Sequence, residues 1–118
     1  MEDYDTHTRF SRLLSLCDEL FADEAYEASY HVLMAGLHVA EGAGDPALLA
    51  EVGARASRHR DHVNRRSPEH PFSDASAVRR GGRAPYETLE LRVASLELSW
   101  RLDTLAARSQ GRSFGRRA

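Results

Sequence analysis

Two histidines and two glutamates share one face of the stretch EASYHVLMAGLHVAE, residues 27–41, if that stretch is a helix. In chain order they are Glu27, His31, His38 and Glu41. Imidazole and carboxylate groups are ligands of zinc, iron and manganese, so this line of side chains could hold a divalent transition metal. His59 and His62 lie further along the chain and could face the line from a neighbouring helix.

A packing role is the alternative interpretation of the same line. Carboxylate-bridged di-iron bundles use a Glu-x-x-His spacing, whereas this stretch has Glu-x-x-x-His and His-x-x-Glu. Met34 stands in the middle of the line, and a thioether is a poor ligand for the metals that carboxylates favour. We therefore expect a packing seam in which a buried histidine stays neutral, and we expect no cofactor. A metal bound by these residues remains the alternative.

Arginine provides all the basic charge outside histidine, because the chain holds 16 arginines and no lysine. Residues 1–51 have a net charge of -9 and residues 52–118 a net charge of +7. A basic segment of this kind could bind phosphates of a nucleic acid or another acidic partner. The candidate residues are Arg65, Arg66, Arg79, Arg80 and Arg83. The pI of about 6.3 is low for a nucleic-acid-binding domain. The basic half could equally pack against the acidic half or against a second copy.

Catalytic chemistry is not indicated by the remaining residues. The chain has 118 residues, 42% of them hydrophobic, which fits one domain. Its one cysteine, Cys17, lies among leucines, where a thiol is usually an inert small apolar group. One cysteine requires no oxidising compartment, and the chain has no apolar run typical of a signal peptide or membrane span, so we expect a cytoplasmic protein. The sequence leaves enzymatic activity open and favours a non-enzymatic protein.

Apolar residues recur at spacings of three and four in four stretches, which predicts an all-α, four-helix bundle-like domain. The predicted helices cover residues 7–21, 24–41, 46–64 and 85–108. GAGDP at 42–46 ends the second helix with glycine and starts the third with Asp45 as its cap and Pro46 in its first turn. The predicted inner face of the third helix consists of Leu48, Leu49, Val52, Ala56, His59 and Val63.

The segment between the third and fourth helices is long for a compact domain. We expect residues 65–84 to be irregular, with one short helical turn at 74–80. The domain is expected to span residues 1–108, and residues 109–118 to form a flexible basic tail.

The last predicted helix is apolar on two sides. One stripe consists of Leu89, Val93, Leu96 and Trp100, and the second of Leu91, Leu98, Leu102 and Leu105. A helix of this kind lies deep in a bundle or shares one side with a partner. We expect a homodimer that uses the second stripe as its interface.

Residues 10–63 resemble a tetratricopeptide-type helical hairpin. The short GAGDP turn joins two helices there, and Ala28, Val32 and Ala35 stand at the spacing of that repeat's packing positions. The resemblance implies binding of a peptide or protein and brings no catalytic residues. The leading hypothesis is therefore a non-enzymatic protein–protein interaction or adaptor module. A metal- or cofactor-binding bundle and a nucleic-acid-binding accessory protein are the alternatives.

Overall fold

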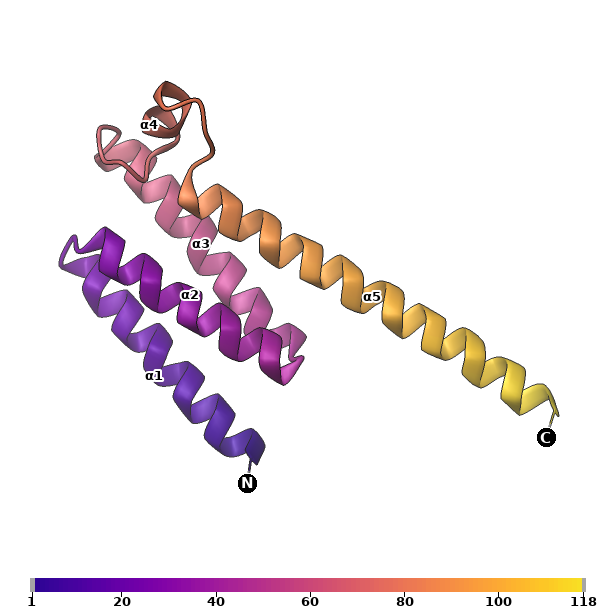
Figure 1. The fold of residues 1–118 in the computed structure, drawn as a ribbon. Coiled ribbons are helices and arrows are strands. Elements are labelled where there is room, and N and C mark those ends of the chain that lie inside the picture. The colour runs from indigo at the N-terminus through magenta and orange to yellow at the C-terminus, as the bar shows by residue number, and fades with distance from the viewer. Residues whose placement is uncertain (1, 118) are drawn as a thin grey trace.

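The computed structural model describes residues 2–117 of the chain, and the side chains of residues 4–110, as five helices without a strand (Figure 1). The helices are α1 (Glu2–Ala22), α2 (Tyr26–Ala43), α3 (Pro46–Arg66), α4 (Asp74–Arg79) and α5 (Pro85–Arg117). The predicted all-helical class is confirmed. The predicted number of four helices is corrected to five within this part of the chain, because the expected short turn at 74–80 forms a separate helix.

The turn between α2 and α3 has the predicted chemistry. Gly44 takes a left-handed backbone with φ of 62°, and the Asp45 side chain accepts hydrogen bonds from the backbone of Ala47 and Leu48. The turn between α1 and α2 differs from the expectation. Glu24 takes the left-handed conformation there, and α2 begins at Tyr26 and not at residue 24.

The helices are arranged as an open, flat array. Helix α1 packs along α2, α2 along α3, and α3 along α5 (Figure 1). The principal extents of the backbone are 63 × 36 × 17 Å, so the array is thin in one direction. Within the described part of the chain, one side of α5 therefore has no neighbouring helix.

A continuous core joins the inner faces of the four long helices. All six residues predicted for the inner face of α3 are buried. The first four of them, from Leu48 to Ala56, form one cluster with Phe10 and Leu14 of α1, Leu33 and Leu37 of α2, and Leu89 of α5. Val63 belongs to a second cluster with Tyr26 and Tyr86. The periodicity of apolar residues therefore identified the core-facing side of α3.

The connection between α3 and α5 is held by polar contacts. Ser73 caps α4 through its hydroxyl, and the Asn64 side chain accepts a hydrogen bond of 2.8 Å from the backbone of Asp74. The Arg60 guanidinium contacts Asp74 at 2.9 Å, and it also contacts carboxylates at the start of α5. These contacts attach α4 to the two long helices on either side of it.

Candidate functional site

The second apolar stripe of α5 is exposed. The exposed fractions are 47% for Leu91, 54% for Leu98, 56% for Leu102 and 53% for Leu105. These four side chains, called the leucine face below, lie opposite Leu89 and Val93, which are buried in the core. A helix with two apolar sides was expected either deep in the bundle or with one side against a partner. The exposure of the leucine face excludes a position deep within the chain's own bundle.

The C-terminal part of α5 extends past the other helices (Figure 1). Every side chain from residue 101 to residue 110 is exposed. A helix without packing contacts is marginal in water, because most helical stability in proteins comes from burying an apolar face. The leucine face is therefore the strongest candidate on the described surface for contact with a partner. The backbone of α5 continues to Arg117, so the predicted helix end at 108, followed by a flexible tail, is corrected; the side chains of 111–118 lie outside the described residues.

Most of the line of residues 27–41 lies on the outer side of α2, but Met34 is half-buried against the core. His31 and His38 are exposed, as is Glu27, and His31 approaches Glu27 no closer than 4.0 Å. Glu41 instead accepts a hydrogen bond of 2.7 Å from Arg92 on α5. The expectation that a histidine of this line is buried in a packing seam is wrong, because α2 turns its leucines and small residues toward α1 and α3.

His59 occupies a different environment from the two histidines of α2. Its ring is 6% exposed and stacks on Phe21 of α1, with 3.7 Å between ring centroids. The rings of His62 and Phe21 meet edge to face, with 5.1 Å between their centroids. The pKa of His59 is lowered to about 4, chiefly by burial, with smaller contributions from Arg58, Arg55 and His62 and an opposing effect of Asp18. His59 is therefore neutral at pH 7.

Cys17, Asp18 and His59 bring potential metal-ligand atoms within 4.8 Å of one another, the one such group among the described residues. Their present contacts oppose metal binding. Arg55 donates to both oxygens of Asp18, at 3.0 and 3.1 Å, and lowers the pKa of that carboxyl. Burial raises the pKa of the Cys17 thiol, which lies 3.3 Å from the Ser29 hydroxyl. A metal would have to displace Arg55 and deprotonate a buried thiol.

The sequence contained one signal for this cluster. His59 stands among apolar residues on the predicted inner face of the third helix, which indicates a buried imidazole. Its contacts with α1 depend on how α1 and α3 sit in space, so they could not be predicted. One ring nitrogen, Nδ1, is buried without a hydrogen-bond partner.

The five candidate arginines lie at the end of the molecule where α3 stops and α4 forms (Figure 1). Three of them bind protein oxygens nearby. Arg65 pairs with Asp61 at 2.8 Å, Arg79 donates to the Ser76 hydroxyl at 3.0 Å, and Arg80 donates to the Pro71 carbonyl at 2.8 Å. Arg66 and Arg83 are exposed. This end of the molecule is basic, and part of its hydrogen-bonding capacity serves the connection itself.

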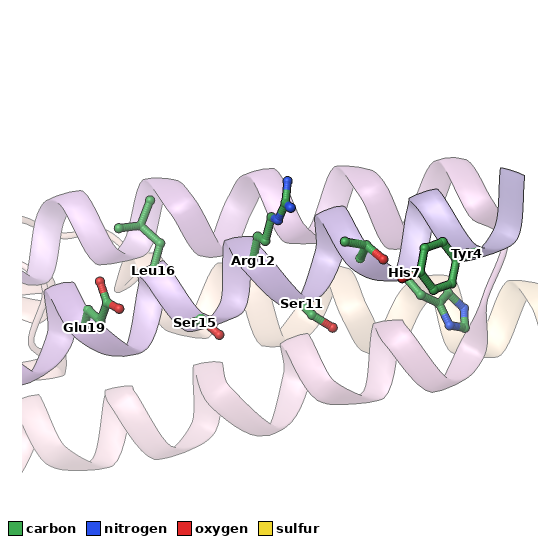
Figure 2. A pocket seen from close by; sticks show the side chains of 8 residues that line it. Tyr4, His7, Ser11, Arg12, Ser15, Leu16 and Glu19 are labelled. Carbon is green, nitrogen blue, oxygen red and sulfur yellow. The ribbon is translucent and has the colours of Figure 1, made fainter. Parts of the chain in front are cut away.

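A depression of about 550 Å³ lies along the outer side of α1 (Figure 2). All eight lining residues come from this one helix. Figure 2 shows Arg12 and Leu16 pointing to one side of α1, while Ser11 and Ser15 point to the other. His7, the one imidazole in this depression, contacts Asp45 at 3.1 Å, so its observed hydrogen bond is not to a serine of α1.

Replacing His31 and His38 together with glutamine should change the free energy of unfolding by less than about 0.5 kcal/mol, as is usual for exposed positions. The side chain of His31 is 68% exposed. Urea unfolding with and without a chelator measures the effect. A loss above 1 kcal/mol, or stoichiometric metal that disappears in the double variant, would contradict the assignment of both histidines to the exposed surface.

Among the residues that the structure describes, no helix combines the length and the apolar character that a membrane crossing needs. The chain matches no family model, and no curated protein or solved structure is similar enough to count as a match. The function of this chain must therefore be inferred from its own surfaces and side chains.

Proposed function

We propose that the chain is a non-enzymatic protein–protein interaction module that binds its partner through the leucine face of α5. The observation that supports this is the exposure of Leu91, Leu98, Leu102 and Leu105, each about half exposed, on the side of the helix opposite the core. The resemblance of residues 10–63 to a tetratricopeptide hairpin suggests the same class of function. We propose a cytoplasmic location, because one cysteine requires no oxidising compartment.

Burial of the leucine face supplies a driving force for association. Fully burying a leucine contributes roughly 1.5–3 kcal/mol, so covering a half-exposed one contributes about 1 kcal/mol. Four such side chains in one line give an apolar contact about 20 Å long, since an α-helix rises 1.5 Å per residue. A facing helix of a partner matches a straight, narrow contact of this kind.

A photo-crosslinking amino acid placed at Leu105 tests this proposal in cells. We expect a covalent adduct with a polypeptide, because Leu105 lies within the proposed contact. Placing the same group at Leu16 is the control, since this leucine of α1 is 44% exposed but lies outside the leucine face. Adding Leu98→Asp and Leu102→Asp should abolish the adduct by putting two charges into the apolar contact. No adduct at Leu105 above the level at Leu16 would overturn the proposal.

A metal-binding bundle is a second candidate. The gathering of Cys17, Asp18 and His59 favours it, together with the unpartnered Nδ1 of the buried His59. Elemental analysis of the purified chain tests it. Metal near one equivalent, lost on His59→Gln, would support this candidate over a structural role for the cluster.

A further inference from the structure

We propose that the partner of the leucine face is the leucine face of a second copy, with the two α5 helices antiparallel and the two-fold axis beside residue 100. This inference rests on the proposed function and names its partner. The support comes from the order of large and small residues along the face and from the order of charges beside it.

The apolar contact follows a heptad pattern. Spacings of four and three alternate along the face from residue 91 to residue 109, as in a coiled-coil seam. In chain order the six positions hold Leu91, Ser95, Leu98, Leu102, Leu105 and Ser109. All six side chains are exposed. The seam therefore contains four large apolar side chains and two small polar ones.

The antiparallel arrangement matches small residues with large ones. With the axis beside residue 100, Leu98 faces Leu102 of the second copy. Ser95 then faces Leu105 of the second copy, and Leu91 faces Ser109. A parallel arrangement in register would instead stack serine on serine at two levels and leave gaps in the seam. The order of residues along the helix therefore favours antiparallel pairing.

Charges on one flank of the seam follow the same logic. Glu90 and Glu97 precede residue 100 on this flank, and Arg101 and Arg108 follow it. In the antiparallel pair, Arg101 of one copy and Glu97 of the other are separated along the helix axis by the length of two residues. Arg108 and Glu90 of the second copy are separated by the same length. Two residues correspond to about 3 Å along a helix, which is within the reach of an arginine. In a parallel pair this flank would instead face the opposite flank of the second copy, so Arg101 would not meet Glu97 of the second copy.

On the opposite flank the sign of the charges also changes at residue 100. Arg92 precedes residue 100 there, and Asp103 follows it. Arg92 and Glu90 also have partners within their own chain, since Arg92 contacts Glu41 at 2.7 Å and Glu90 contacts Arg60 at 3.3 Å. Glu97, Arg101 and Arg108 form no ion pair among the described residues, which leaves them available to a second copy.

The position of α5 in the fold leaves room for this arrangement. The chain's own helices contact the side of α5 that carries Leu89 and Val93, so the second copy approaches from the opposite side. The part of α5 that extends past the other helices would lie along residues 90–99 of the second copy. Each copy thereby covers the helical segment, residues 101–110, that is fully exposed in a single chain.

Light scattering and spin-label distances on the purified chain test the proposal. We expect a mass about twice the 13.2 kDa of one chain at micromolar concentration. Cys17 is fully buried, so a nitroxide can be attached at Ser109→Cys without replacing it. The antiparallel pair places the two labels about 27 Å apart along the helix axis, eighteen residues at 1.5 Å each. A label at Ser99→Cys, close to the axis, is the control and should give a short distance.

A charge swap provides a second, independent measurement. Arg101→Glu should weaken the dimer at least tenfold, because it places a glutamate opposite Glu97 of the second copy. Adding Glu97→Arg to the same chain should restore the wild-type dissociation constant. Parallel helices would show no such rescue.

Together with the crosslinking experiment, these measurements distinguish failure of the dimer from failure of the interaction module. A monomer at micromolar concentration, with an adduct to another protein at Leu105 in cells, would overturn the second copy as partner but keep the interaction module. A dimer with a Ser109 distance near 10 Å would overturn the antiparallel arrangement. Absence of both the dimer and the adduct would overturn both.

Discussion

Lowering the pH from 7 to 4 should reduce the free energy of unfolding by about 3 kcal/mol through His59 alone, since one pKa unit corresponds to about 1.36 kcal/mol. The imidazole is 6% exposed, and burial lowers its pKa from 6.5 to about 4. The unfolded chain therefore binds a proton below pH 6.5, while the folded chain does not. Stability is lost as the pH falls from about 6.5, and the loss levels off below pH 4.

Urea unfolding at several pH values between 7 and 4.5 measures this effect. His59→Leu should remove most of the pH dependence in that window, because no imidazole remains to be protonated on unfolding. His31→Gln is the matched control, since His31 is exposed, and it should keep the wild-type slope. An equal slope in the His59→Leu variant would show that another group is responsible.

A direct titration of the ring covers the case in which His59→Leu does not fold. In wild-type protein, nuclear magnetic resonance should show no protonation of His59 above pH 5. A midpoint near 6.5 would mean that the ring is exposed to water, and that its stacking on Phe21 at 3.7 Å does not persist in solution.

Helical periodicity predicted the core because only one side of each helix packs inward. The six inner residues predicted for α3 are all buried, and the first stripe of α5 contacts the core. Periodicity also identified both apolar sides of α5. It could not distinguish a side covered by the same chain from one left exposed, because that depends on the positions of the other helices. The leucine face was therefore predicted as a set of residues, and only the structure shows that it is free.

The side chains of α2 illustrate a limit of sequence reasoning. The line that contains His31 and His38 was expected to be partly buried, because α2 is apolar around most of its circumference. Leu33, Leu37 and Gly36 take the inner side, and both histidines face outward, while Met34 of the same line is half-buried against the core. Close packing at Gly36, where an added Cβ would lie 3.2 Å from Leu14, shows how near α1 lies to that side. The same sequence pattern would also fit an α2 that is rotated by a quarter turn about its own axis, and that helix would bury other residues.

The contacts of Arg60 lay beyond prediction because they join distant parts of the chain. The guanidinium lies 2.9 Å from Asp74, 3.7 Å from Glu87 and 3.3 Å from Glu90. Its side chain is 28% exposed, and those of its partners are 28–37% exposed. The ion pairs are therefore partly screened by water, but one cation still serves three carboxylates. The segment expected to be irregular at 65–84 is attached to α3 and α5 through this residue.

Arg60→Ala should lower the free energy of unfolding by about 2 kcal/mol, because it removes hydrogen bonds to charged groups and leaves three carboxylates close together. The value is set below that of a fully buried network because all four side chains are partly exposed. Arg65→Ala is the matched control, since it removes an exposed arginine of the same helix that pairs with Asp61 at 2.8 Å. That change should cost at most about 0.5 kcal/mol, as is usual for a surface ion pair.

Hydrogen exchange locates the effect within the fold. Amides of α4 and of the start of α5 should lose protection first in Arg60→Ala, because Asp74 and Glu87 lie in those segments, whereas amides in the middle of α2 should change little. This order follows from the contacts, since α2 is held by the apolar core, whereas Arg60 and Asn64 attach the start of α4 to α3. Equal losses of stability in Arg60→Ala and Arg65→Ala, with unchanged protection of α4, would mean that Ser73 and Asn64 suffice to hold the connection in place.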